Sequence, residues 1–440
     1  MKLNWFSPIP PAKTDIAEYT MRVIPALSHY AEVLLWTDQS TWNSEVEKYA
    51  KVCQYNFVNV PWAEINEADL NIYHIGNNTN FHYETWQISQ QCPGLVILHD
   101  FKLQHFFTGI YKEKQNNQQA YISYISHMKR YYGVEGEQAG VRFWNGALTT
   151  EYMAEHYPLT FLALENAVGV VTHTKEVFHT LKQKNRWLVG YAPLPYVSKW
   201  QAKTSNKVVN APYRLIIFGY IGPNRCLEPF LKALSNFPER DHFRLDIYGE
   251  VWDKNYICYQ IQKLGLSDLV KLHGFVKESE LDSALANAHL AVNLRYPTMG
   301  EASGSQLRIW SHALPSLVTQ VGWYAEQPEN TVAFVRPEHE IEDIQQHFRN
   351  FIANPELFAA KGKKGQQLLQ EQHNPKIYAQ AIISFAENSQ KFRSNAVAFD
   401  LIEKVAEELS SWMNYEILNS QLEQIAEAIY FIGREFHKFK

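Results

Sequence analysis

The feature that most constrains this chain is a strand, helix and strand pattern at its amino terminus that starts again at residue 213. Residues 3–36 read as a short apolar strand, a proline-containing loop, an amphipathic helix and a second apolar strand. From residue 213, the strand RLIIF leads through the loop GYIGPN and an apolar helix into a second strand, FRLDIYGE. Strands joined through a helix lie parallel in one sheet, so each half of the chain predicts a β-α-β unit.

Both halves continue to alternate apolar strands with helical segments. The further strand candidates are NIYHIG, GLVILHD and GVVTHT in the first half, and VKLHGF, HLAVNLR and SLVTQ in the second. We therefore expect an α/β protein with two doubly wound parallel-sheet domains. In residues 193–212, prolines bracket a polar stretch, which predicts the hinge between the domains.

These patterns divide the chain into an amino-terminal domain of residues 1–195, a carboxyl-terminal domain of residues 196–385 and a helical tail of residues 386–440. The tail carries an apolar stripe, which needs a covering surface. We expect it to pack on the body of the protein; a dimer contact or a membrane surface would also cover it. The stripe consists of Leu418, Leu422, Ile425, Ile429, Ile432 and Phe436.

Charge and cysteine content exclude several classes of function. Lys plus Arg number 41 and Asp plus Glu 46, so the formal charge of −5 offers no basic field for nucleic acid. The four cysteines lie far apart, which argues against a zinc site and a disulfide framework. The first residues lack the apolar core of a secretory signal, and no stretch reaches the roughly 18 apolar residues of a membrane span. We expect a cytoplasmic protein, with peripheral contact at the inner membrane face as an addition; the oligomeric state stays open.

The most informative loop follows the strand HLAVNLR, where the chain reads YPTMGEASGSQLR and enters a helix. In an open parallel sheet, ligands bind beyond the carboxyl ends of the strands, where helix amino termini present free N–H groups. The small residues Ala302, Ser303, Gly304 and Ser305 would let a diphosphate approach the backbone. Glu301 could accept hydrogen bonds from sugar hydroxyls. A Ser/Gly helix cap and a solvated acid would give the same pattern.

A second loop of this kind, GYIGPNR, follows the strand RLIIF. Its glycines Gly219 and Gly222 permit a tight backbone, and Arg225 at the start of the next helix would neutralise a phosphate. A solvated first-turn arginine is the alternative. Neither loop has the spacing of a P-loop or of a dinucleotide-binding GxGxxG motif, which disfavours kinase and dehydrogenase functions.

In the first half, GLVILHD ends with His99 and Asp100 at a strand end that we expect to face the other domain. His99 can donate a hydrogen bond to a sugar hydroxyl or to a leaving group, and a structural histidine is the alternative. His74, Asn77 and Asn78, in NIYHIGNN, offer neutral donors and acceptors that suit polyol recognition. We take Asn77, Asn78 and Asp100 as candidate acceptor-binding residues.

Taken in order, these motifs resemble the retaining glycosyltransferases of sequence family 4, bacterial type, over roughly residues 1 to 385. GYIGPNR is similar to the family's glycine-started loop with its basic residue, HGFV to its loop at the nucleotide base, and GEASGS to its donor-sugar turn. FSPIPPAKTDIAEYT is similar to the first donor-facing loop, and VILHD to the strand that ends in the functional histidine. The resemblance implies the GT-B fold, in which two Rossmann-like domains face each other across a cleft.

The resemblance also implies roles for individual residues. His99, Glu301 and Arg225 would be catalytic: Glu301 positions the sugar, Arg225 stabilises the diphosphate and His99 lies on the sugar side of the cleft. The implied donor-binding residues are Asp15, Gly219, Tyr220, Asn224, Arg225, Gly274, Phe275, Val276, Glu301, Ala302, Ser303, Gly304 and Ser305.

The chain departs from the family pattern at three places. Ile309 stands where the family usually has a second Glu at the ribose, Tyr220 stands where many members have Arg, and Lys13, Thr14 and Asp15 replace paired glycines. Because no Asp-x-Asp motif lies near the loops, we expect neither a metal nor a cofactor.

The implied reaction moves a hexose, with retention, from a nucleotide-diphosphate sugar to a saccharide or lipid-linked acceptor in polysaccharide or glycoconjugate synthesis. The resemblance favours UDP-glucose as donor over a GDP-linked sugar. Two alternatives remain: a nucleotide-sugar epimerase or phosphorylase on the same fold, and a catalytically silent binding subunit, which the missing second Glu would suit.

Overall fold

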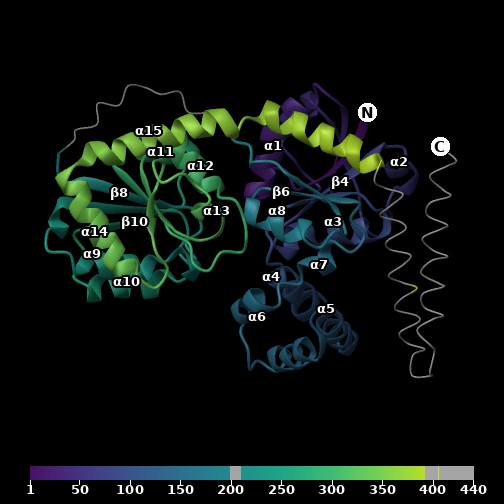
Figure 1. Cartoon of the computed structure of the whole chain (residues 1–440), viewed down its shortest axis with the longest axis horizontal. Coiled ribbons are helices and arrows are strands. Elements are labelled where there is room, and N and C mark those ends of the chain that lie inside the picture. The colour runs from purple at the N-terminus through teal and green to yellow at the C-terminus, as the bar shows by residue number, and fades with distance from the viewer. Residues whose placement is uncertain (199–209, 392–404, 406–440) are drawn as a thin grey trace.

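The computed structural model of the chain describes residues 1–198, 210–391 and 405. These residues form two α/β halves that lie beside each other, each built around its own sheet (Figure 1). Residues 418–436, which carry the predicted apolar stripe, lie outside the described residues. Among the described residues, no helix combines the length and the apolar character needed to cross a membrane.

Within residues 1–198, seven strands form one parallel sheet in the order β3-β2-β1-β4-β5-β6-β7. The order reverses direction at β1 and β4, which is the pattern of a doubly wound sheet. The strands are β1 (Lys2–Phe6), β2 (Glu32–Thr37), β3 (Lys51–Gln54), β4 (Leu70–Ile75), β5 (Leu95–Leu98), β6 (Gly169–Thr172) and β7 (Leu188–Tyr191). The helical elements are α1 (Asp15–Leu27), η1 (Ser44–Lys48), α2 (Trp62–Asn66), α3 (Thr79–Gln91), α4 (Gln104–Thr108), η2 (Gly109–Gln115), α5 (Gln118–Trp144), α6 (Thr150–His156), α7 (Thr160–Ala163) and α8 (Lys175–Lys182).

Helix α1 is capped at its amino terminus and buries the apolar stripe that the sequence predicts. Thr14 caps the helix by accepting a hydrogen bond from the N–H of Ile16, and Asp15 in the first turn favours the positive end of the helix dipole. The predicted apolar stripe is buried against β1 and β2, with Tyr19, Val23 and Leu27 each at most 2% exposed. The first loop of the chain is thereby fixed at the carboxyl edge of the sheet.

Helices α4 to α7 form an insertion between β5 and β6 that projects away from the sheet (Figure 1). Inside α5, Gly133 has a φ of +65° and separates two helical arms. Only glycine adopts such a φ readily, so this residue permits the chain to turn back within the insertion.

Within residues 210–391, six strands form a second parallel sheet in the order β10-β9-β8-β11-β12-β13. The strands are β8 (Tyr213–Phe218), β9 (Phe243–Tyr248), β10 (Val270–Gly274), β11 (Leu290–Asn293), β12 (Ser316–Thr319) and β13 (Ala333–Val335). The helical elements are η3 (Pro223–Arg225), α9 (Leu227–Ser235), η4 (Arg240–His242), α10 (Lys254–Lys263), α11 (Glu278–Asn287), α12 (Gly304–Ser311), α13 (Gly322–Ala325), α14 (Glu340–Ala353) and α15 (Pro355–Gln372). Both predicted doubly wound sheets are therefore confirmed.

The chain returns to the first half after α15. Residues 375–391 are helical, and Tyr378, Ala379 and Ile382 are buried in the same cluster as the residues of α1 and β1. The hydroxyl groups of Tyr19 and Tyr378 lie 2.6 Å apart, so one is hydrogen-bonded to the other. The two halves are thus connected by covalent chain at two places, near residue 198 and near residue 373.

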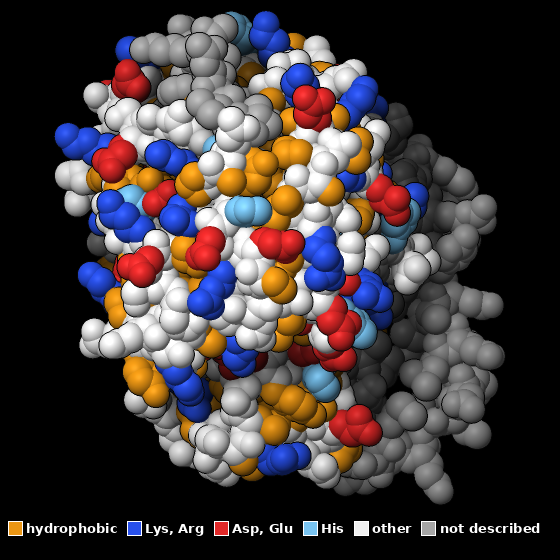
Figure 2. All heavy atoms as spheres, turned by 90° about the vertical axis from the view of Figure 1, so that its left-hand side faces the viewer, with side chains coloured by type: hydrophobic (Ala, Val, Ile, Leu, Met, Phe, Trp, Pro, Cys, Tyr) orange, Lys and Arg blue, Asp and Glu red, His pale blue; other side chains and the backbone are white. Residues whose placement is uncertain are grey.

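The outer end of the carboxyl-terminal half carries charges of both signs. Figure 2 shows Lys and Arg side chains interspersed with Asp and Glu over this face. This distribution agrees with the sequence argument against a basic field for nucleic acid.

Candidate functional site

The loop between β11 and α12 carries Glu301, and its carboxylate is held by its own loop. Oε1 accepts a hydrogen bond from Nη1 of Arg295 at 2.5 Å, and Oε2 accepts from Oγ1 of Thr298 at 2.8 Å and from the N–H of Met299 at 2.7 Å. Burial alone would raise the pKa of Glu301, but Arg295 and these hydrogen bonds outweigh burial and lower it. Glu301 is therefore ionised, and it keeps about one of its roughly four acceptor positions for a ligand.

Two arginines lie beside this loop, Arg225 buried and Arg295 half-buried. Arg225 is 5% exposed, and its Nη2 lies 3.4 Å from the backbone oxygen of Phe218. Burial, followed by the charge of Arg295, lowers the pKa of Arg225 to about 10. Burial would also lower the pKa of Arg295, but the charge of Glu301 outweighs burial and raises that pKa.

The two guanidinium groups keep unused hydrogen-bond donors. Nε of Arg225 and Nε of Arg295 are both buried, and neither has a hydrogen-bond partner among the described residues. Unsatisfied buried donors are costly, and Arg295 lies close enough to lower the pKa of Arg225, so the two cations repel. A ligand with more than one negative charge would relieve both costs.

The amino terminus of α12 adds backbone donors to this cationic region. Ser303 caps the helix, since its Oγ accepts a hydrogen bond from the N–H of Gln306 at 3.1 Å. The N–H groups of Gly304 and Ser305 follow, at the positive end of the helix dipole. The carboxylate of Asp15, at the start of α1, faces this end: its Oδ2 lies 3.9 Å from the position that a Cβ on Gly304 would take. An acid of the amino-terminal half thus lies where an anionic ligand would be attracted.

The opposite wall of the cleft begins at the end of β5 with His99. This side chain is 9% exposed, and its Nε2 lies 3.0 Å from Nδ1 of His74. Burial, followed by the neighbouring histidines, lowers the pKa of His74 and of His99 well below the usual value. Both imidazoles are therefore neutral near pH 7.

Asp100 follows His99 and is hydrogen-bonded to the predicted acceptor loop. Its Oδ2 accepts from the N–H of Asn77 at 2.8 Å. Burial, followed by the charge of Glu301 on the other wall, raises the pKa of Asp100 to about 7. Asn78 caps α3, because its Oδ1 accepts from the N–H of Asn80 at 3.0 Å. Asp100 is thus an acid whose charge changes near neutral pH directly beside the cleft.

The two walls meet at the loop that carries Glu301. The N–H groups of Phe101 and Lys102 both donate to the backbone oxygen of Met299 at 2.8 Å. Gly300 has a φ of +81°, and a Cβ there would stand 2.5 Å from Cβ of Phe101. Glycine is therefore required at position 300 by its backbone conformation and by the close approach of the other half.

Exposed aromatic side chains mark the region where the sequence places the nucleotide base. Phe275 follows Gly274 at the end of β10 and is 83% exposed, with Nζ of Lys13 lying 5.9 Å from its ring centroid. Val276 next to it is half-buried. Tyr220 follows Gly219 in the loop after β8 and is 66% exposed.

The position of the missing second Glu is part of the apolar core. Ile309 is 1% exposed and packs in a cluster with Phe218 and Leu285. Arg308 beside it forms ion pairs with Glu278 and Asp282, each at 2.7 Å. Neither residue is therefore free to replace the carboxylate that the family uses at the ribose.

The structure brings several of the predicted residues close together, since Glu301 and Asp15 lie near enough to affect the pKa of both Arg225 and Asp100. Glu301, Arg225 and the start of α12 come from the carboxyl-terminal half, and Asp15, His99 and Asp100 come from the amino-terminal half. The loops of Asn224 and of Glu301 are joined by a hydrogen bond of 2.8 Å from the N–H of Tyr296 to the backbone oxygen of Asn224. Ala302 is half-buried in the second of these loops.

Sequence reasoning missed Arg295 and the contact of His74 with His99. Arg295 comes directly after the apolar strand HLAVN, and its place at a strand end was the available signal. His74 lies in β4, and its contact with His99 could not be read from the sequence. Among the described residues, no group of three or more His, Cys, Asp or Glu side chains is arranged to hold a metal ion.

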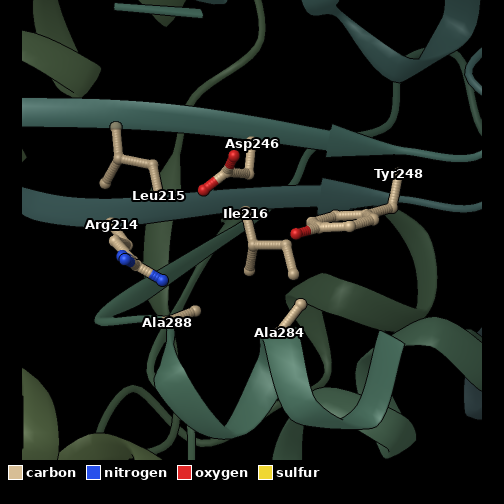
Figure 3. Close-up of a pocket in the computed structure, with 7 residues that line it drawn as sticks. All are labelled: Arg214, Leu215, Ile216, Asp246, Tyr248, Ala284 and Ala288. Carbon is tan, nitrogen blue, oxygen red and sulfur yellow. The ribbon is translucent and has the colours of Figure 1, made fainter. Parts of the chain in front are cut away.

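Two further hollows contain none of the predicted donor residues. The first, of about 20 Å³, lies between β8, β9 and α11, with Arg214, Asp246 and Tyr248 in its lining (Figure 3). This volume holds about one water molecule. The second, of about 560 Å³, lies beside α1 and α15, and its lining includes Arg22, Tyr196 and Gln366.

Comparison with known proteins supports the same fold. Residues 198–368 match the family described as glycosyl transferases group 1. No curated protein matches the chain. The structure is similar to sucrose-phosphate synthase from Thermosynechococcus elongatus, with a TM-score of 0.60 at 15% identity over 88% of this chain and 98% of the other.

Two further solved structures share this architecture. HepE from Anabaena, in complex with UDP-glucose, gives a TM-score of 0.60 at 12% identity over 88% of this chain and 100% of the other. WaaG, a glycosyltransferase involved in lipopolysaccharide biosynthesis, gives a TM-score of 0.52 at 14% identity over 88% of this chain and 98% of the other. The chain is therefore a glycosyltransferase with the GT-B fold, and its carboxyl-terminal half carries a domain of the glycosyl transferases group 1 family.

Proposed function

We propose that the chain transfers a hexose, with retention of configuration, from UDP-glucose or a similar nucleotide-diphosphate sugar to a saccharide or lipid-linked acceptor. The observation that carries this proposal is the pair of guanidinium groups of Arg225 and Arg295, whose buried Nε atoms have no hydrogen-bond partner in the described part of the chain. A nucleoside diphosphate supplies the charge and the acceptor oxygens that this pair lacks. The UDP-glucose bound to the structurally similar HepE supports the choice of donor.

In this proposal the leaving diphosphate is stabilised by protein donors. Arg225 lies near enough to Arg295 for the charge of Arg295 to lower its pKa, and the start of α12 follows Glu301, which Arg295 contacts. In this mechanism these donors stabilise the negative charge that grows on the leaving oxygen. Glu301 fixes Arg295 and offers its remaining acceptor position to a sugar hydroxyl. His99 and Asp100 complete the site only when the two halves are closed, so transfer requires the closed form.

The assignment of the domains and of the membrane contact rests on the sequence patterns. We propose residues 1–195 as the acceptor domain and residues 196–385 as the nucleotide-sugar domain, with the tail of residues 386–440 covering the body of the enzyme. A cytoplasmic location with peripheral membrane contact, metal independence and a role in polysaccharide synthesis also remain predictions.

A panel of nucleotide sugars tests the proposal. Thermal stabilisation identifies the donor, since a ligand at 100 times its dissociation constant adds ~2.7 kcal/mol to stability. UDP-glucose should stabilise the wild-type chain and should do so less in the Arg295→Met variant, which keeps an unbranched, shorter side chain without the charge. Stabilisation by no nucleotide sugar, or equal stabilisation of both proteins, would contradict the proposal. Interconversion of the donor without an acceptor would instead indicate an epimerase, and a need for free phosphate a phosphorylase.

A further inference from the structure

The contact between His74 and His99 has chemical consequences beyond packing. His74 lies in β4, His99 follows the neighbouring strand β5, and the N–H of His99 donates to the backbone oxygen of Ile75 at 2.9 Å. This pairing holds Nδ1 of His74 3.0 Å from Nε2 of His99. His74 is 0% exposed, whereas His99 retains 9% of its surface. Of the two rings, His99 is the one that a ligand in the cleft can reach.

Both imidazoles are neutral and their facing nitrogens form a hydrogen bond. One of these two nitrogens therefore carries a proton, and the other accepts the bond. A neutral imidazole carries one N–H and one lone pair. Either His74 donates from Nδ1 to Nε2 of His99, or His99 donates from Nε2 to Nδ1 of His74. In the first arrangement His99 keeps its proton on Nδ1, and in the second it presents a lone pair there.

The surroundings of His74 select between these arrangements. Its Nε2 is buried and finds no hydrogen-bond partner in residues 1–198 or 210–391. If His99 donated, this Nε2 would carry a proton and become a buried N–H without an acceptor. The ring of Trp5, with its centroid 4.3 Å from that of His74, already has a buried Nε1–H that lacks a partner in the same part of the chain. A second orphaned donor beside the first is strongly disfavoured, whereas a lone pair on Nε2 of His74 adds none.

The other nearby histidines do not compete for the proton. Nδ1 of His82 lies 3.0 Å from the backbone oxygen of His74, and Nδ1 of His173 lies 2.9 Å from that of Ala192. A carbonyl oxygen only accepts hydrogen bonds, so both of these rings carry their proton on Nδ1. Their bonds leave the contact between His74 and His99 undisturbed.

We propose that His74 is a positioning residue that fixes His99 in the tautomer with the proton on Nδ1. His99 then presents an N–H donor to the cleft. Its partner is a hydrogen-bond-accepting oxygen of the donor substrate, either on the diphosphate or on the sugar. The identity of this partner rests on the proposed function, but the tautomer of His99 does not.

Nitrogen NMR of ¹⁵N-histidine-labelled protein tests the tautomer without any ligand. The signals of His99 are identified by their loss in His99→Gln, and protonated and unprotonated ring nitrogens are distinguished by their chemical shifts. We expect the wild-type protein to show His99 protonated on Nδ1 and unprotonated on Nε2. His74→Leu should lose this preference, whereas His173→Leu should keep it. The second variant removes a buried imidazole 5.1 Å from His99, between ring centroids, without removing the bond to His74. A proton on Nε2 of His99 in the wild-type protein would overturn the proposal.

Kinetic measurements then test what the N–H group of His99 contributes to the reaction. His74→Leu should lower kcat/KM for UDP-glucose roughly tenfold, the effect of one lost hydrogen bond. His74→Asn should recover part of the loss, because its amide can donate from a similar position. Weaker binding of UDP alone to His74→Leu would assign the partner to the diphosphate, and unchanged UDP binding with slower transfer would assign it to the sugar. Wild-type turnover by a folded His74→Leu would overturn the positioning role. Failure of UDP-glucose as a donor would contradict the proposed function, with the NMR result still deciding the tautomer.

Discussion

Replacing Gly300 by alanine should open the contact between the two halves. A Cβ on Gly300 would stand 2.5 Å from Cβ of Phe101, an atom fixed to the backbone, so the halves must separate locally to relieve the clash. Separation would break the two hydrogen bonds that Met299 accepts from Phe101 and Lys102. At ~0.5–1.5 kcal/mol for each bond, the loss is about 1–3 kcal/mol, which lowers the ratio of closed to open form roughly 5- to 150-fold.

Turnover of UDP-glucose should fall by the same factor, because transfer requires the closed form. Affinity for UDP should change little, because its proposed contacts lie in the carboxyl-terminal half. Gly146→Ala is the matched control: Gly146 has a φ of +79° but no atom within 4 Å of an added Cβ, so it measures the backbone strain alone. Combining Gly300→Ala with Phe101→Gly removes the clashing atom and should restore part of the turnover. Wild-type turnover by Gly300→Ala, or no recovery in the double variant, would refute control of closure by this contact.

Four further predictions concern the chemistry of the cleft. Arg225→Ala should weaken binding of UDP in calorimetry roughly 10- to 150-fold, since a hydrogen bond to a charged group is worth ~1.5–3 kcal/mol. Glu301→Gln should instead impair transfer of the sugar. An equal loss of UDP affinity in the two variants would contradict these roles. Asp15→Asn should strengthen UDP binding about 2- to 5-fold, because it removes the acid that faces α12 and a charge at a helix terminus is worth ~0.3–1 kcal/mol. The control Glu18→Gln, in the same turn of α1, should leave UDP binding unchanged. Because the pKa of Asp100 is raised from 3.8 to about 7, the protonated acid favours the folded, closed form below pH 3.8, and this contribution is lost as pH rises to 7. Turnover should therefore decline as pH rises toward 7 and level off above it, and Asp100→Asn should remove this dependence. Treatment with a chelator should leave turnover intact, and strict dependence on Mg²⁺ or Mn²⁺ would argue against the mechanism.

The positions of the predicted donor loops follow from local sequence patterns. Apolar strands and amphipathic helices repeat with their own periods, so RLIIF, HLAVN and the stripe of α1 could be placed before any contact was known. In a parallel sheet every carboxyl end lies at the same edge, which brought Arg225 and Glu301 together from loops about 75 residues apart in sequence.

Other features could not be predicted because they depend on contacts between distant segments. The helical pattern after residue 355 predicts a helix, but only packing shows that Tyr378 lies against Tyr19 of α1. The insertion of α4 to α7 likewise follows no repeat of the β-α-β pattern. The sequence shows only that Ile309 replaces the Glu that the family usually has at the ribose. Its burial against Phe218 shows that it belongs to the apolar core.

The sequence by itself determined the class of fold, the two sheets and the edge at which the site lies, because strand and helix periods and the geometry of parallel sheets are local properties. Only the tertiary structure decided the protonation and partners of the site. The charge of Asp100 depends on Glu301 from the other half, and the proposed tautomer of His99 depends on His74 in the next strand. Most of the acceptor positions of Glu301 are taken by Arg295 and by its own loop. These properties are set by burial and by distances of a few ångströms between side chains, which no spacing along the chain encodes.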